Sequence, residues 1–180
     1  AAWGIGSSVA AAALLTVVEL GGLLIVIGAG AEHIAELPER MNEFVPTLDV
    51  GLWAGIFAGS FLAFYAFIGF EDIVNMAEET KDPTRVVPWA IMLTLAVTAV
   101  LYVLVSVVAL LSVPLSELAG SAAPLKLVYA RATGSSGALI GVIGILAMVN
   151  GALIQLIKGA RVLYGLSRQG VLPAWFGQVN

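Results

Sequence analysis

A single acidic residue lies inside the first long apolar run of this 180-residue chain, and its position needs a chemical explanation. Glu19 interrupts the run Val9–Gly30 near its middle. A carboxylate at the centre of a membrane costs a few kcal/mol and rarely faces lipid, and removal from water favours its neutral form. Glu19 is therefore a candidate proton carrier. The alternative is a structural carboxyl that only joins helices by hydrogen bonds, and the sequence leaves both open.

The residues one or two turns from Glu19 are small. Ala12, Thr16 and Gly22 lie on one side of a helix with it. Small residues let the backbones of neighbouring membrane helices approach closely. We therefore expect this side of the first run to pack against another helix.

A second set of candidates lies where the next apolar run meets acidic residues. From Phe61 the chain continues Leu-Ala-Phe-Tyr-Ala-Phe-Ile-Gly-Phe-Glu-Asp, which places Gly69 just before two acids. Glycine lets the backbone leave the helix, and irregular backbone at membrane depth survives only beside protein or a cavity. Broken helices of this kind form the sites of secondary transporters. An ordinary span that leaves the membrane at Glu71 fits the pattern equally well.

No pattern in the chain indicates catalysis or metal binding. His33 and Glu36 form half of a zinc-protease motif, but the second His is missing. The chain has no Cys, no phosphate-binding glycine loop and no nucleophile beside a base. With 8 Lys and Arg and a net charge of -4, it is not a nucleic-acid binder. We expect no catalytic residues, no metal, no cofactor and no enzymatic activity.

The composition indicates a membrane protein. Hydrophobic residues make up 60% of the chain and charged residues 11%, too few charges for a soluble enzyme. A membrane helix needs roughly 20 mostly apolar residues. We place Pro88 near the first turn of the third span, where a proline costs no helix bond. Four spans are predicted: Val9–Gly30, Val50–Phe70, Val86–Val113 and Ser135–Ile157.

The connectors between these spans differ in charge. Connectors 31–49 and 114–134 are each expected to hold a short amphipathic helix. Connector 71–85 and the C-terminal tail hold five basic residues and the other two hold three: Lys81, Arg85, Lys158, Arg161 and Arg168 against Arg40, Lys126 and Arg131. Positive charge favours the cytoplasmic side, so the loop 71–85 and the tail are predicted to be cytoplasmic.

The fourth span carries a stripe of small residues and two amides. The stripe, which Met148 interrupts, predicts close helix packing. Asn150 either faces a transport path or makes a hydrogen bond to another helix, and the sequence leaves this open. The stripe consists of Gly137, Gly141, Gly144, Gly151 and Gln155.

Two segments resemble the amino acid permeases of the amino acid–polyamine–organocation superfamily. Residues 64–88, Phe-Tyr-Ala-Phe-Ile-Gly-Phe-Glu-Asp onward, resemble the sixth transmembrane segment and the loop after it. Residues 161–173, Arg-Val-Leu-Tyr-Gly-Leu-Ser-Arg-Gln-Gly-Val-Leu-Pro, resemble the end of the eighth segment. The resemblance implies an all-α integral membrane fold in which this chain is a partial transporter domain, segments five to eight of a five-plus-five inverted repeat of the leucine-transporter type. The implied spans are about 9–30, 50–80 with a break near Gly69, 86–113 and 135–167.

The resemblance also implies roles for the residues at the break. Backbone carbonyls there accept the ammonium group of the substrate, and an aromatic residue closes over it. Glu71 matches a position that some relatives use in gating or proton response, and Glu19 and Asn150 are further candidates for gating or proton coupling. The alternative for the aromatic residues is ordinary helix packing. The implied substrate-binding residues are Tyr65, Ala66, Phe67, Ile68, Gly69 and Phe70.

The expected function is therefore secondary active transport of an amino acid by proton-coupled symport across the plasma membrane. The alternatives are amino acid exchange, transport of a polyamine or other organic cation, and a membrane sensor that does not transport. The expected partners are an amino acid, protons or a counter-substrate, the lipid bilayer and further transmembrane segments. Because the chain lacks an initiator Met and a signal-peptide layout, we expect it to be an excerpt, and four helices alone not to transport.

Overall fold

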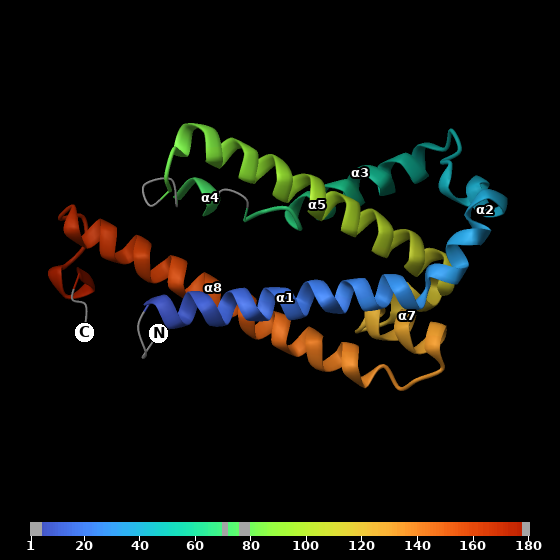
Figure 1. Ribbon diagram of the computed structural model, residues 1–180. Helices are drawn as coiled ribbons and strands as arrows, with labels where there is room; N and C mark the ends of the chain where they lie inside the picture. Colours follow the sequence, from blue (N-terminus) through green and yellow to red (C-terminus); the bar gives the residue numbers. More distant parts are fainter. Residues whose placement is uncertain (1–4, 70–71, 76–79, 178–180) are drawn as a thin grey trace. The chain divides into compact units, whose positions relative to one another are not determined.

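The computed structural model describes residues 5–69, 72–75 and 80–177 of the chain, and within these ranges the structure contains helices and connecting segments without β-strands. Figure 1 shows the helices in chain order. Their bounds are α1 Ile5–Ala29, the 3-10 helix η1 Ala31–Glu36, α2 Leu37–Phe44, α3 Val50–Tyr65, α4 Asp72–Asn75, α5 Pro83–Ser112, α6 Leu115–Gly120, α7 Pro124–Thr133, α8 Ala138–Arg168 and the 3-10 helix η3 Ala174–Gly177.

Three of the described helices have the length and apolarity of a membrane crossing. They are the Ala11–Ala29 part of α1, with mean hydropathy 2.3, α5 with 2.6 and α8 with 2.2. At about 1.5 Å per residue, α5 and α8 are long enough to cross a hydrocarbon core of about 30 Å, and the Ala11–Ala29 part of α1 is nearly long enough. Helix α3 is apolar but has only 16 residues. It ends at Tyr65, five residues before the predicted end of the second span.

The start of α5 differs from the prediction for Pro88. The helix begins at Pro83, whose fixed φ suits the first helical position, after Asp82 in the left-handed region at φ 52°. Pro88 therefore lies in the second turn and not in the first. It has no N–H to donate to the carbonyl of Thr84, so the prediction that it costs no helix bond was wrong.

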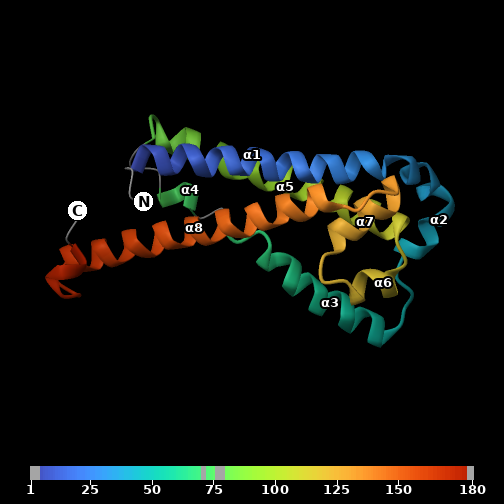
Figure 2. The ribbon, with the colours of Figure 1, turned by 90° about the horizontal axis from the view of Figure 1, so that it is seen from below.

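The chain divides into two compact units, and the first consists of residues 1–28 and 121–180. Its long helices α1 and α8 pack against each other in antiparallel directions, as Figure 2 shows. A Cβ added at Gly22 of α1 would lie 2.8 Å from Ile143 Cγ2 of α8. The expected close approach at the small-residue side of the first span is thus confirmed at Gly22.

The end of α8 is closed by a glycine. Gly170 has φ 77°, and the N–H groups of Val171 and Leu172 bond back to the carbonyl of Leu166 at 3.0 and 3.3 Å. Such bonds from beyond a left-handed residue satisfy the last carbonyls of a helix. The helix continues to Arg168, eleven residues past the apolar run that ends at Ile157.

The second unit, residues 29–120, is built on α5. The 3-10 helix η1 packs on the C-terminal half of α5, where Val108 fills the space that a side chain at Gly30 would need. Helix α4 lies beside α5 in both ribbon views. Helix α3 is capped at its N-terminus by Asp49, whose carboxylate accepts the N–H of Leu52 at 2.8 Å.

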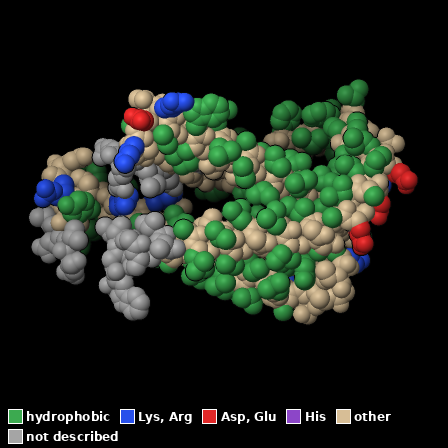
Figure 3. All heavy atoms as spheres, in the orientation of Figure 1, with side chains coloured by type: hydrophobic (Ala, Val, Ile, Leu, Met, Phe, Trp, Pro, Cys, Tyr) green, Lys and Arg blue, Asp and Glu red, His purple; other side chains and the backbone are tan. Residues whose placement is uncertain are grey.

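Apolar side chains cover the long helices on their outer faces as well. Figure 3 shows hydrophobic side chains over α1 and α5, whereas the charged side chains gather near helix ends. Leu93 of α5 is 65% exposed and Val103 61% exposed. A soluble domain rarely exposes so large a continuous apolar surface, so these faces suit lipid or further apolar helices. The expected amphipathic helices of the connectors are α2 in the first and α6 with α7 in the second.

Candidate functional site

The segment after α3 tightens into a turn that contains four of the predicted site residues. The N–H groups of Ala66, Phe67 and Ile68 bond to carbonyls three residues earlier, at 3.0, 3.0 and 3.2 Å. This is 3-10 geometry, narrower than the α-helix before it. Gly69 follows with φ 127°, which L side chains rarely adopt. The α-helix thus ends at Tyr65, and the 3-10 turn after it leads to a glycine in a conformation that few other residues adopt.

Tyr102 of α5 holds this turn from the opposite side. Its hydroxyl donates a hydrogen bond to the carbonyl of Ala66 at 3.1 Å. Its ring meets Phe67 edge to face, with centroids 5.2 Å apart and planes at 68°. Aromatic pairs favour this arrangement because the edge of one ring is positive and the face of the other negative. Residues 66 and 67 are thereby tied to α5.

A cavity of about 270 Å³ lies between the turn and α5. Thr94, Thr98 and Tyr102, which lie at intervals of four residues on one face of α5, line this cavity, and each carries a hydroxyl group. Ile73 of α4 and Leu95 complete the lining with apolar groups. The rest of the lining is the turn itself, Ala66, Phe67, Ile68 and Gly69.

The structure brings four of the six predicted substrate-binding residues to one cavity. The side chain of Tyr65 is 76% exposed and does not line it. Phe70 and Glu71 lie outside the described residues. The sequence interpretation missed the hydroxyl face of α5, although Thr94, Thr98 and Tyr102 at four-residue spacing within an apolar helix are the signal that would have found it.

A second polar cluster joins α1 to α8. Asn150 Nδ2 donates to Glu19 Oε1 at 2.7 Å and makes a long contact of 3.5 Å with Thr16 Oγ1. Asn150 is 2% exposed, and its Oδ1 has no hydrogen-bond partner within the described part of the chain. Asn150 therefore makes an interhelical hydrogen bond, one of the two alternatives for it, and its partner is the acid of the first span.

Among the described residues, the glycine stripe of α8 makes its contacts near its beginning. Gly137 and Gly141 lie against Lys126 of α7, whereas a Cβ at Gly144 or Gly151 would meet nothing described within 4 Å. Close packing along the rest of the stripe stays a prediction. Helix α8 turns Ile143 and Asn150 toward α1, and the glycines that follow each of them lie on another side of the helix.

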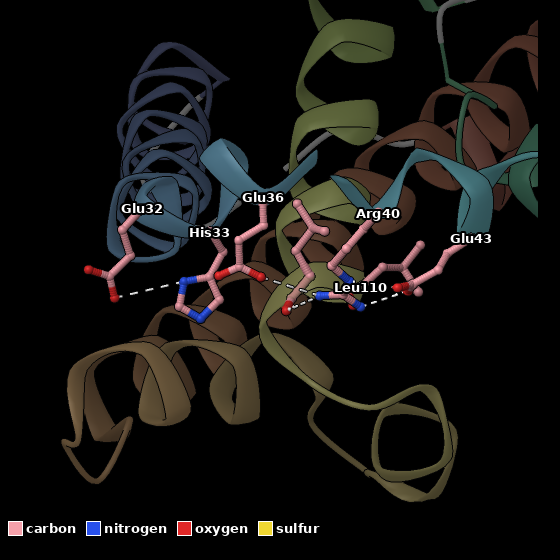
Figure 4. Close-up of polar contacts among 7 residues, drawn as sticks. Glu32, His33, Glu36, Arg40, Glu43 and Leu110 are labelled. Atoms are coloured by element: carbon pink, nitrogen blue, oxygen red, sulfur yellow. Dashed lines mark hydrogen bonds and ion pairs between the residues drawn. The ribbon is translucent and has the colours of Figure 1, made fainter. Parts of the chain in front are cut away.

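A third cluster lies in the connector after α1 and caps α5. Arg40 binds Glu43 through two bonds of 2.8 and 2.7 Å, and Glu36 lies 3.7 Å away. Its guanidinium also donates to the carbonyls of Leu111 at 2.9 Å and Leu110 at 3.5 Å (Figure 4). Those carbonyls belong to the last turn of α5, which has no helical partners for them.

The electrostatics of this cluster follow from its hydrogen bonds. The bond from Arg40 lowers the pKa of Glu43 below the ordinary 4.5, and the same bond raises the pKa of Arg40. His33 lies 3.8 Å from Glu32 Oε1, and within the described ranges no group of three potential metal ligands occurs. The cluster is therefore an ion pair that caps a helix.

The whole described structure lies within a known family. The family model for amino acid permeases matches residues 2–180. The chain belongs to the amino acid permease family. This permease chain is thus part of a membrane protein, and the family is one of transporters, which agrees with the prediction that the chain is not an enzyme.

Curated relatives of this permease chain come from bacteria and animals. It is 30% identical to the branched-chain amino acid permease BcaP of Bacillus subtilis over 168 residues. This alignment covers 93% of the chain and 35% of BcaP. It is 35% identical over 128 residues to the cationic amino acid transporter 4 of Mus musculus, covering 71% of the chain and 20% of the relative. An uncharacterized transporter of Mycobacterium tuberculosis is 33% identical over 171 residues, 93% of the chain and 37% of that protein. The chain thus spans between 20% and 37% of the length of these relatives, and no solved structure matches it significantly.

Proposed function

We propose that the protein containing this chain is a secondary active transporter that moves an amino acid across the plasma membrane by proton-coupled symport. The observation that carries the proposal is the amino acid permease match along residues 2–180. In this proposal the chain supplies segments five to eight of a five-plus-five inverted repeat, with spans at about 9–30, 50–80, 86–113 and 135–167. The loop 71–85 and the C-terminal tail are cytoplasmic.

The proposed substrate site is the turn after α3. The carbonyls of Tyr65, Ala66 and Ile68 accept the ammonium group of the amino acid, and Tyr65 closes over the substrate as a gate. Phe67 and Phe70 line the pocket, and Gly69 permits the break in the span. The 3-10 turn, the φ of 127° at Gly69 and the cavity beside it support this proposal. Carbonyls that leave the helical ladder at membrane depth are suited to hold a cationic group.

The proposed proton site is the pair of Glu19 and Asn150. An amide can serve both protonation states of a carboxyl group, because its NH2 donates to a carboxylate and its oxygen accepts from a protonated acid. Asn150 Nδ2 makes the first of these bonds at 2.7 Å, and its Oδ1 is available for the second. Protonation of Glu19 thus exchanges one hydrogen bond for another within the same pair of residues. Glu71 remains a proposed gating residue.

The experiment uses the full-length protein in proteoliposomes and measures uptake of labelled amino acids with and without an inward proton gradient. The two named relatives suggest leucine and arginine as the first substrates, since one is a branched-chain permease and the other a cationic amino acid transporter. We expect accumulation against a concentration gradient that requires the proton gradient. Glu19→Gln should abolish this accumulation and leave downhill flux measurable. Glu39→Gln, the same change at an exposed position of α2, is the matched control.

Other results of the uptake experiment would favour one of the alternative functions. Flux that appears only when the lumen is preloaded with amino acid would make the protein an exchanger and Glu19 a structural residue. Uptake of polyamines and not of amino acids would make it an organic-cation transporter. Absence of any flux from well-folded protein would favour a membrane sensor.

A further inference from the structure

The hydrogen bond between Tyr102 and Ala66 lies at the proposed substrate site and has a consequence for it. The turn bonds after α3 use the carbonyls of Ala63, Phe64 and Tyr65 as acceptors. The carbonyl of Ala66 comes next, and it accepts from the hydroxyl of Tyr102 at 3.1 Å. The direction of this carbonyl is thus fixed by a side chain of α5 and not by the ladder of its own helix.

The carbonyl oxygen of Ala66 can accept a second hydrogen bond besides the one from Tyr102. A carbonyl oxygen has two lone pairs and can accept from two donors at once. The phenol takes one of them, and the edge-to-face contact of its ring with Phe67 holds the phenol in place. The second lone pair then has a defined direction beside the cavity that Ala66, Phe67 and Tyr102 line.

We propose that Tyr102 is a positioning residue of the substrate site, which orients the carbonyl of Ala66 so that its second lone pair accepts an N–H of the substrate ammonium group. This inference rests on the proposed function, in which that carbonyl binds the ammonium. Tyr102 itself does not touch the substrate ammonium. A well-oriented acceptor binds more tightly because less conformational freedom is lost when the ligand arrives.

The test is Tyr102→Phe in the full-length protein, which removes one oxygen atom and keeps the ring against Phe67. The KM for the preferred amino acid should rise about three- to tenfold, the value of one hydrogen bond, while the maximal rate per folded molecule changes little. Tyr164→Phe is the matched control. It removes a hydroxyl from α8, at a residue that is 39% exposed and does not line the cavity.

Binding of an N-methylated substrate distinguishes an effect of Tyr102 on the orientation of the Ala66 carbonyl from an effect on the stability of the protein. An N-methylated substrate has one N–H donor fewer, so the wild-type protein should bind it more weakly than the parent amino acid. In Tyr102→Phe this penalty should shrink, because the carbonyl of Ala66 no longer points at the missing donor. A purely structural role of Tyr102 would lower the amount of folded protein and leave the penalty unchanged.

The outcomes are distinguishable. If the wild-type protein transports amino acids and Tyr102→Phe keeps both the KM and the N-methyl penalty, the role of Tyr102 is overturned and the proposed function stands. If the wild-type protein transports no amino acid, the proposed function fails and this inference fails with it. If the Tyr102→Phe protein is not produced in folded form, Tyr102→His replaces it in the test, since histidine moves the hydrogen-bond donor away from the carbonyl of Ala66. An unchanged penalty for the N-methylated substrate in Tyr102→His overturns the positioning role of Tyr102.

Discussion

Arg40 donates a hydrogen bond of 2.9 Å to the carbonyl of Leu111, and this bond fastens the connector after α1 to the end of α5, 71 residues further along the chain. Glu43 holds the guanidinium on its other side through both carboxylate oxygens. A positive charge at the C-terminus of a helix also complements the partial negative charge of its last carbonyls. The connector is therefore attached to α5 by a cap.

Removal of this cap should loosen the second unit. Arg40→Ala in the full-length protein should lower the unfolding midpoint in detergent, because the carbonyls of Leu110 and Leu111 lose a donor. Arg40→Lys should lower it less, since a lysine keeps the charge and loses the two-bond geometry with Glu43. Equal midpoints for all three proteins would show that the cap contributes nothing to stability.

The ion pair also predicts a pH dependence. The pKa of Glu43 is lowered in the folded state by the hydrogen bond from Arg40, so its contribution to stability is fully present above the ordinary value of 4.5. It is lost as the pH falls through the lowered folded pKa. The difference in unfolding midpoint between wild type and Glu43→Gln should therefore stay constant above about pH 4.5 and shrink as the pH falls below it. Glu39→Gln on the same helix should show no such trend, and a difference that grows on acidification would contradict the assignment.

Gly69 should not tolerate a side chain. Its φ of 127° costs an L residue about 1–3 kcal/mol, although a Cβ there would meet nothing described within 4 Å. Gly69→Ala should thus reduce both stability and uptake through backbone strain. Gly144→Ala is the control, because it lies inside α8 with open space beside it and should gain up to about 1 kcal/mol of helix propensity. Calorimetry in detergent and uptake in proteoliposomes measure both effects, and an unharmed Gly69→Ala protein would contradict the argument.

Gly22 and Gly21 form a second matched pair. A Cβ at Gly22 would lie 2.8 Å from Ile143, whereas one at Gly21 would meet nothing described within 4 Å. Gly22→Ala should cost about 1–3 kcal/mol of stability by overpacking, and Gly21→Ala should be neutral or favourable. Ile143→Val combined with Gly22→Ala should recover part of the loss, which a double-mutant cycle measures. Equal effects of the two glycine substitutions would show that α1 and α8 do not pack as described.

The long apolar helices were predictable from the sequence, because charge is absent over stretches that only a membrane or a protein interior accepts. The ends were less predictable. Pro83 starts α5 three residues before the apolar run, and the glycine at 170 closes α8 well after its own run. Both are decided by single backbone conformations that hydropathy does not register.

The site was predictable in part. The Phe-Ile-Gly sequence marks the turn, since glycine in an apolar run is a local signal. The hydroxyl of Tyr102 and the guanidinium of Arg40 act across 36 and 71 residues, so no local pattern places them. The glycines of α8 have a related limit, because a stripe of small residues indicates where close contact is possible and not which helix makes it.

The two described contacts of α8 with α1, at Ile143 and Asn150, are seven residues apart, which is about 10 Å along the helix axis. A slide of one helix along the other by a single turn of about 5.4 Å would break the polar contact and the steric contact together. Because the two contacts lie on the same side of α8 and are separated along its axis, together they fix the register of α1 against α8. A substitution that displaces one of them is therefore expected to displace the other as well.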